Sequence, residues 1–575
     1  MSPEPRISHV DALAKFDLGK YRRTISTRSQ VASEWFNRGL IWCYGFNHEA
    51  AVACFERATQ IDSQCVMAYF GIAYALGPNY NKPWTVFDRA EKAVVLKRTH
   101  DAIRSAQKHL SRASPVEQAL INALQYRYQS QSTNARHDAW NRDYANAMRV
   151  VYRNHPQDLD VAALFADALM NLTPWALWNV GTGLPAEGAY TLEIERVLDK
   201  ALSTEEGLAH PGLLHLYIHF WELSPLPDAA LPIANRLRGL VPDAGHLNHM
   251  PTHLDLLCGN YMDAVESNTV ATHADEKYLD CAGPINFYTV YRLHDYHFLI
   301  YAAMFSGKSK VALDSVKRLE TSLPEKLLRI KSPPMADWLE SFLSTRAHVL
   351  IRFGRWEDIL ALSLPKDQKL YACTTAITLY AKGLAYAATG KIKQADRTRA
   401  QFAKARGLVP LSRTLFNNSF IDILEVAAAM LDGEIEYRRE NYEEAFNHLR
   451  RAVRLDDGLP YDEPWGWMSP TRHALGALLL EQGFVGEAAV IYRADLGLDH
   501  SLPRALRHPN NIWSLHGYHE CLVKLGEREE ALEIAQQLEH VQKYADVPIV
   551  SSCFCRLHTS TSKPGNAKSL QRSSI

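Results

Sequence analysis

The sequence has almost no excess of positive or negative charge, few cysteines and no long apolar run. Each of these shortages excludes a class of protein. Its 575 residues carry 63 basic and 64 acidic side chains, a net charge of −1. Nucleic-acid-binding and membrane-surface proteins usually show a basic surplus or basic runs, and neither is found here. No apolar stretch approaches the ~20 residues of a membrane-spanning helix. Nine cysteines, an odd number without the spacing of a disulfide framework, are typical of a reducing compartment. We therefore expect neither nucleic acid nor a membrane as a partner.

Targeting and cofactor motifs are also absent from the sequence. The N-terminal stretch "MSPEPRISHVDALAKFDLGKYRR" has neither the apolar segment nor the cleavage site of a secretory signal. There is no P-loop, no G-x-G-x-x-G after a strand and no G-x-S-x-G. The sequence thus indicates a cytoplasmic protein without a nucleotide or organic cofactor.

Strand-forming patterns are nearly absent, and the strongest positive signal is an internal repeat. In "WFNRGLIWCYGFNHEAAVACFERATQID", small and large residues follow a 34-residue tetratricopeptide (TPR) frame. Trp35, Gly39, Ala51, Phe55 and Ala58 occupy its positions 4, 8, 20, 24 and 27. Small residues at positions 8 and 20 let the two helices of a repeat approach closely, and larger ones fill the gap between repeats. The same offsets recur in Gly383 with Ala395, and in Gly476 with Ala488 and Tyr492. The sequence predicts an all-α TPR-type solenoid, a superhelix of antiparallel helix pairs.

The repeats divide the chain into five expected segments. They are an N-terminal extension (1–30), N-terminal repeats (31–205), histidine-rich central repeats (206–312), C-terminal repeats (313–545) and a C-terminal tail (546–575). The proline-rich stretches 172–188 and 456–470 are expected to be insertions between repeats. The tail is polar and aperiodic, so we expect it to be largely disordered. Cys553 and Cys555 in "CFC" form a candidate soft-metal or redox pair.

Histidines are concentrated in the central repeats. Residues 210–300 hold nine of the 24 histidines, where length alone would place about four. Aligning Ala230, Ala264 and Ala312 at position 20 starts three repeats at 211, 245 and 293, the third after a 14-residue insertion. In the first repeat, positions 5, 9 and 12 are then His215, His219 and Glu222. In the second, positions 2, 5 and 9 are His246, His249 and His253. In the third, positions 2 and 5 are His294 and His297. These positions lie along one face of the first helix of a repeat, which lines the concave groove in TPR folds. Seven histidines and Glu222 should therefore face one shared volume.

This constellation predicts a transition-metal site. Imidazole suits Zn, Cu or Fe, and histidines at i and i+4, as in His215/His219 and His249/His253, can chelate one ion together. His246, His294 and His297 would be further ligands or would support the ligands, and Glu222 would be a ligand or a general base. Eight candidates exceed what one ion needs, so either some only support the others or the site is binuclear. The first hypothesis is a metal-dependent enzyme acting on a small molecule, by redox chemistry with Cu or Fe or by hydrolysis or hydration with Zn.

The second hypothesis is a non-catalytic TPR scaffold that binds a partner peptide or protein in the groove. The histidines would then be hydrogen-bonding groups that grip the peptide. Pro251 leaves the local geometry open. If it begins a helix, His246 and His249 lie in the preceding loop; if the helix begins at Gly245, Pro251 kinks it. In both cases His253 faces the groove.

Several motifs together resemble a largely uncharacterised group of TPR-repeat proteins found in bacteria and filamentous fungi. The H-M-P-x-H element is the most specific of them, and the ending "SCFCR" looks like that of fungal members. The resemblance spans roughly residues 35–556 and implies an α-solenoid in which the histidine helices form one feature. It implies no particular reaction; fungal members often look like accessory proteins of secondary-metabolite pathways. The matching stretches are "YGFNHEAAVACFERA", "CVMAYFGIAYALGPNYN", "ADALMNLTPW", "HPGLLHLYIHFWE", "GHLNHMPTHLDLLCGNY", "YRLHDYHFLIYAAMF", "YDEPWGWMSPTRHALGALLLEQG" and "ADVPIVSSCFCR".

Overall fold

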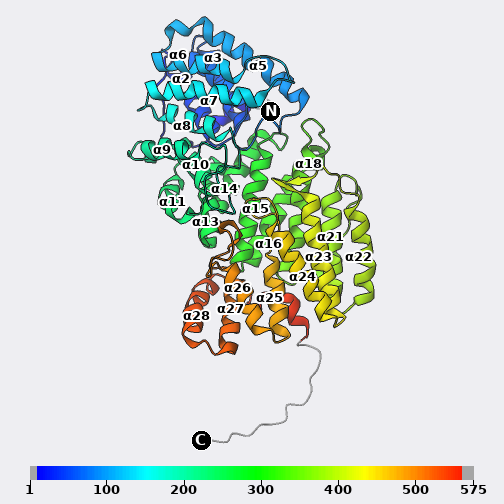
Figure 1. Cartoon of the computed structure of the whole chain (residues 1–575). Helices are drawn as coiled ribbons and strands as arrows, with labels where there is room; N and C mark the ends of the chain where they lie inside the picture. Colours follow the sequence, from blue (N-terminus) through cyan, green and yellow to red (C-terminus); the bar gives the residue numbers. More distant parts are fainter. Residues whose placement is uncertain (1–8, 560–575) are drawn as a thin grey trace, which may run out of the picture.

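Helix follows helix along almost the whole chain in the computed structural model, which describes residues 9–559 (Figure 1). The described part contains twenty-eight α-helices and a single small β-hairpin, β1 (Thr414–Leu415) paired with β2 (Asn418–Ser419). Consecutive helices pack against one another in pairs, such as α2 with α3 and α21 with α22. The predicted all-α repeat fold is confirmed.

The helices form three groups along the sequence. The N-terminal group consists of α1 (His9–Leu13), α2 (Gln30–Tyr44), α3 (His48–Ile61), α4 (Val66–Leu76), α5 (Arg89–Lys108), α6 (Pro115–Arg127), α7 (His137–Asn154), α8 (Leu159–Met170) and α9 (Thr191–Leu202). The central group consists of α10 (Pro211–Trp221), α11 (Pro227–Ala234), α12 (Gly245–His249), α13 (Pro251–Cys258), α14 (Tyr261–Ala282), α15 (Thr289–Phe305) and α16 (Ser309–Ser322).

The C-terminal group is the largest, and most of its helices lie in the lower half of the molecule in Figure 1. It consists of α17 (Glu325–Leu328), α18 (Met335–Leu339), α19 (Thr345–Arg352), α20 (Trp356–Ala361), α21 (Ala372–Ala388), α22 (Ile392–Arg406), α23 (Phe420–Arg438), α24 (Tyr442–Asp457), α25 (Thr471–Glu481), α26 (Val485–Asp495), α27 (Ile512–Leu525) and α28 (Arg528–Gln542).

Glycines of the repeat frame account for the close packing of the helix pairs. A Cβ added to Gly39 would lie 2.7 Å from the ring of Phe55, and one added to Gly71 of α4 would lie 2.6 Å from the same ring. A Cβ on Gly476 would lie 2.5 Å from the ring of Tyr492. The large side chain of one helix thus fills the space that the small residues on its neighbours leave open, as the repeat frame predicts.

Two of the predicted repeat starts are confirmed and the third is wrong. Helices begin at Pro211 and Gly245, as the frame requires, but α15 begins at Thr289 and not at Leu293. The expected 14-residue insertion is partly helix, because α14 continues to Ala282 and α15 begins at Thr289. The proline-rich stretch 172–188 contains no helix, and the stretch 456–470 contains none after Asp457, where α24 ends, which agrees with their interpretation as insertions.

Two apolar cores meet at the central helices. One core is formed by buried residues between Leu13 and Tyr291, and the other by buried residues between Leu256 and Cys555. Helices α13 and α15 contribute to both, because their apolar residues point to either side. Polar side chains on these helices are therefore enclosed between the two cores.

Both ends of the described chain pack against the repeats. Arg23, in the predicted N-terminal extension, forms ion pairs with Asp158 (2.8 Å) and Asp160 (2.7 Å). The prediction of a largely disordered tail is wrong for 546–559, since Ile549 and Cys555 are only 3% and 2% exposed. These residues dock because they are apolar, unlike the rest of the tail, and residues 560–575 lie outside the described range. The structure joins Cys553 and Cys555 in a disulfide.

None of the helices in residues 9–559 is both long enough and apolar enough to cross a membrane.

Candidate metal centre

The histidine-rich helices α10, α12, α13 and α15 lie side by side between the two cores. Helix α10 begins with Pro211 at its first position, where the missing N–H needs no partner. The side chain of His210 accepts a hydrogen bond from the amide of Leu213 and caps the same end (3.1 Å). Helix α12 packs against α14, and a side chain at Gly245 would overlap the carboxylate of Asp275. Glycine at this position is what allows the close approach of α12.

Pro251 divides the H-M-P-x-H element into two consecutive helices. Helix α12 ends at His249 and α13 begins at Pro251, while Met250 between them keeps a helical conformation (φ −50°, ψ −42°). Both expectations for Pro251 hold in part: it begins a helix, and His246 and His249 are nevertheless helical. His249 and His253 therefore keep the i, i+4 relationship of a single helix.

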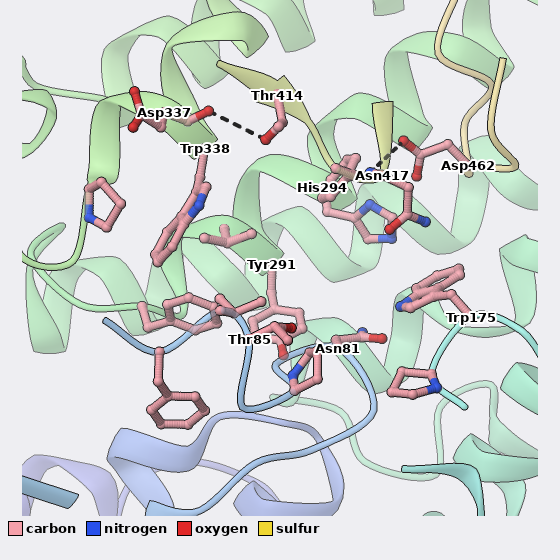
Figure 2. Close-up of a pocket in the computed structure, with 18 of the residues that line it drawn as sticks. Asn81, Thr85, Trp175, Tyr291, His294, Asp337, Trp338, Thr414, Asn417 and Asp462 are labelled. Carbon is pink, nitrogen blue, oxygen red and sulfur yellow. Dashed lines mark hydrogen bonds between the residues drawn. The ribbon is translucent and has the colours of Figure 1, made fainter. Parts of the chain in front are cut away.

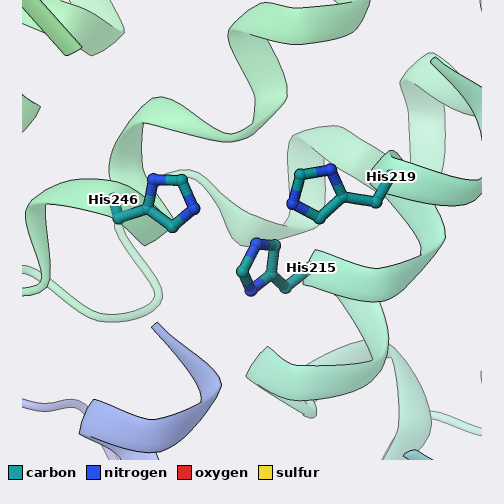
Figure 3. Close-up of side chains that lie close together, drawn as sticks. All are labelled: His215, His219 and His246. Atoms are coloured by element: carbon teal, nitrogen blue, oxygen red, sulfur yellow. The ribbon is translucent and has the colours of Figure 1, made fainter. Parts of the chain in front are cut away.

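The first group of histidines, called triad one here, consists of His215, His219 and His246 (Figure 3). One nitrogen from each ring lies within 4.8 Å of the other two. The Nδ1–H of His215 donates to the carbonyl oxygen of Tyr44 (2.5 Å), and Nδ1 of His219 is 2.9 Å from Oε1 of Glu222. The Nε2 atoms of both rings are buried and have no hydrogen-bond partner. This is how metal-binding histidines are held: one nitrogen is fixed by an acceptor, and the other is free for the ion.

The second group, called triad two here, consists of His249, His253 and His294. Nε2 of His253 lies 2.9 Å from Nε2 of His249 and 3.4 Å from Nε2 of His294. The Nδ1–H of His249 donates to Oδ1 of Asn268 (2.7 Å), whose amide nitrogen is committed to the carbonyl of Ala264. Nε2 of His249 therefore carries a lone pair that points at the other two rings.

Two buried carboxyl groups, of Glu222 and Asp295, connect the triads, and a third, of Glu463, contacts triad two alone. Oε1 of Glu222 contacts His219 of triad one, and its Oε2 lies 2.9 Å from Nδ1 of His253 in triad two. Asp295 also lies between the triads. Its Oδ1 is 3.8 Å from Nδ1 of His246 in triad one and 3.6 Å from Nδ1 of His249 in triad two. Glu463 also contacts Nδ1 of His253. Carboxylates behind imidazole ligands fix the ring orientation and raise the basicity of the ligating nitrogen.

Burial sets the protonation of the site. It lowers the pKa of five of the histidines well below the ordinary value, and neighbouring imidazoles lower the pKa further. The five are His215, His219, His246, His249 and His294. Burial raises the pKa of Glu222 to about 8 and that of Glu463 well above its ordinary value. These five imidazoles are therefore neutral at pH 7, which is the form that binds a metal ion.

His297 is set apart from the other predicted ligands. Its Nε2 lies 2.7 Å from Sδ of Met468, and its ring packs on Phe342 and Phe416. It shares no nitrogen cluster with the other six histidines. Of the eight predicted site residues, the structure brings together seven.

The clustered histidines, which were predicted to face a concave groove, are enclosed. Five of the six clustered histidines are at most 1% exposed, and His294 is 7% exposed. Loops cover them because the two proline-rich insertions fold over the helices: Trp175 packs on His219 (5.8 Å between ring centroids), and the 459–470 stretch supplies Glu463.

The sequence analysis missed Asp295 and Glu463. Asp295 lies in "LHDYH" between two predicted ligands, and an acidic residue in an otherwise apolar helix was the available signal. Glu463 lies in an insertion 210 residues from His253, and nothing in the local pattern connects them.

No family model matches the sequence, and no curated protein matches it. Among solved structures, the chain is similar to a chain of the APC/C hetero-tetramer Cut9–Hcn1, at 12% identity over 82% of this chain and 74% of that one, with a TM-score of 0.30. It is also similar to human IFIT1 in its dimer with PPP-AAAA (16% identity, 74% and 72% covered, TM-score 0.27). A third similar structure is yeast Tom70 (11% identity, 89% and 93% covered, TM-score 0.25). Because these scores are low, the fold assignment rests on the helix packing of this chain.

Proposed function

We propose that this protein binds two transition-metal ions, one at each histidine triad, and acts as a metal-dependent enzyme. His215, His219 and His246 would hold one ion, and His249, His253 and His294 the other. Three imidazoles leave a tetrahedral ion with one open position, which is typical of catalytic sites and not of structural ones. Glu222 and Asp295, which lie between the triads, would orient both sets of ligands.

The observation that carries this proposal is the 2.9 Å separation of Nε2 in His249 and Nε2 in His253. Nδ1 of His249 is occupied by an amide oxygen, and Nδ1 of His253 faces the carboxylates of Glu222 and Glu463. The lone pair on Nε2 of His249 therefore points at Nε2 of His253 in a dry interior. A metal ion bound by three imidazoles would lie where these nitrogen atoms converge and would satisfy them together.

The donor atoms restrict which metals suit the site. Imidazole nitrogen suits Zn, Cu and Fe, whereas Mg and Ca prefer oxygen ligands. Copper or iron would support redox chemistry, and zinc would support hydrolysis or hydration. The identity of the bound metal therefore decides between these reaction classes.

Metal analysis of the purified chain tests the proposal. The protein is expressed with Zn, Cu or Fe supplied in turn, dialysed, and measured by inductively coupled plasma mass spectrometry. We expect two ions per chain in the wild type, and loss of the triad-two ion in a His249→Ala/His253→Ala double variant. Circular dichroism and gel filtration check that the variant is folded. A correctly folded wild type that stays metal-free after all three treatments overturns the proposal.

Partner binding through other surfaces is compatible with a helical-repeat fold. A scaffold role of this kind would not use the enclosed histidines, and it would leave the lone-pair arrangement in triad two without a purpose.

A further inference from the structure

A cavity of about 640 Å³ opens beside triad two, and segments far apart in the sequence form its walls (Figure 2). They are the loop at 81–88, the insertion at 174–175, α15, α18, the β-hairpin and residue 462. His294 both lines this cavity and belongs to triad two. The volume falls within the ~300–1,000 Å³ of small-molecule sites.

Aromatic side chains dominate two sides of the cavity. Trp338 and Trp175 lie on opposite sides in Figure 2, with Tyr291 between them. Trp175 also packs on His219 of triad one, and Phe416 packs on His294 of triad two, with ring centroids 5.8 and 4.8 Å apart. A planar molecule in the cavity would thus contact rings that touch a histidine of each triad.

Two of these aromatic residues have unfavourable backbone conformations. Phe416 has φ 47° and Trp175 has φ 58°, in the left-handed region that favours glycine. Phe416 is the first of the two turn residues between β1 and β2, a position where a hairpin of this kind usually has glycine. Such conformations cost free energy and are concentrated at functional sites. The placement of the two rings is thus maintained at a cost to stability.

Some polar atoms of the cavity lack hydrogen-bond partners, and its acidic side chains disfavour anions. Oδ1 of Asn81 and Nδ1 of His294 are buried and have no hydrogen-bond partner. Asp88, Asp337 and Asp462 line the cavity, and none of its described lining residues is lysine or arginine. A ligand that fits would present a flat apolar ring, at least one hydrogen-bond donor and no negative charge.

We propose that this cavity is the substrate pocket and that it binds an uncharged aromatic alcohol of the phenol class. This proposal rests on the proposed metal function. The ring lies between Trp338 and Trp175, and its hydroxyl group points to Asn81 or to the His294 side of the pocket. The bound ring is then next to the open coordination position of triad two.

Isothermal titration calorimetry with 2-naphthol tests the pocket. The full-length chain is used in metal-loaded form and after treatment with EDTA. We expect 2-naphthol to bind both forms, and 2-naphthoate (an anion) and decahydro-2-naphthol (not aromatic) to bind at least about tenfold more weakly. Trp338→Leu should weaken 2-naphthol binding by about tenfold without changing the metal content. The matched control is Trp178→Leu, which replaces a tryptophan outside the cavity that stacks on Trp221.

The outcomes separate the pocket from the metal function. If 2-naphthol does not bind, or if Trp338→Leu and Trp178→Leu bind it equally, the pocket assignment is overturned. Should Trp338→Leu fail to fold, Asn81→Leu replaces it, with the same expected loss. If 2-naphthol binding depends on Trp338 but the chain holds no metal after any treatment, the proposed function is refuted and the pocket assignment stands. In copper-loaded protein, 2-naphthol should alter the Cu(II) electron paramagnetic resonance spectrum, and an unchanged spectrum would overturn the placement beside triad two.

Discussion

Nε2 of His249 lies 2.9 Å from Nε2 of His253, across the break between α12 and α13. This pair belongs to triad two, while His246, only three residues before His249, belongs to triad one. Single substitutions should therefore remove metal ions selectively. We expect His215→Ala to lose the triad-one ion and His253→Ala to lose the triad-two ion, each leaving about one ion per chain by mass spectrometry.

His297→Ala is the control for these substitutions. His297 is a buried histidine of the same helix as His294, but it contacts Met468 and not the triads. The variant should keep both ions even if it loses stability. Loss of an ion in His297→Ala, or loss of both ions in every variant, would contradict the division into two triads.

The carboxylate of Glu222 should control metal affinity without being required for folding. It contacts an imidazole of each triad through a different oxygen atom, so Glu222→Gln replaces one of these oxygen atoms by an amide group and disturbs one of the two contacts. Losing such a carboxylate typically costs about 10–100-fold in metal affinity. Competition with a chromogenic chelator measures this change. The control is Glu434→Gln, since Glu434 is equally buried but pairs with Arg438 away from the site; equal affinities in the two variants would refute the role of Glu222.

The repeat packing predicts opposite effects for two Gly→Ala substitutions. A methyl group at Gly476 would lie 2.5 Å from the ring of Tyr492, so Gly476→Ala should destabilise the protein by about 1–3 kcal/mol. Gly486 in α26 has no neighbour within 4 Å of the added atom, and Gly486→Ala should stabilise its helix by up to about 1 kcal/mol. Thermal unfolding followed by circular dichroism compares the two. A melting temperature that falls equally in both variants would contradict the assigned packing.

Acid should destabilise the fold through buried neutral histidines such as His348. Burial lowers the pKa of His348 from its ordinary 6.5 to about 4, and the residue packs on Trp467 outside the candidate metal centre. Between these two values the unfolded chain binds a proton that the folded chain does not. The free energy of unfolding therefore falls as the pH drops from 6.5 to 4, by up to about 3 kcal/mol for this residue.

Urea unfolding of the wild type and His348→Leu at pH 7.5 and pH 4.5 measures this contribution. The variant should lose less stability between the two pH values than the wild type does. Identical losses would show that His348 does not carry the proton uptake.

The sequence by itself predicted the helices and most of the site, because both depend on local spacing. A separation of 34 residues places His215 and His249, and likewise His219 and His253, at equivalent points of successive repeats. The i, i+4 pairs then follow from helix geometry alone. Small residues such as Gly39 and Gly476 identified the packing positions for the same reason.

Tertiary structure decided how the histidines divide and what surrounds them. His246 joins His215 and His219, and His297 turns to Met468, because ring positions depend on how α10, α12, α13 and α15 pack together. The partners of the rings come from distant segments: the Tyr44 carbonyl is 171 residues from His215, and Glu463 lies in an insertion. The enclosure of the site also depends on those insertions, which have no periodicity that could predict where they fold. Local periodicity fixes which face of a helix a residue occupies, whereas contacts between distant segments depend on the packing of the whole chain.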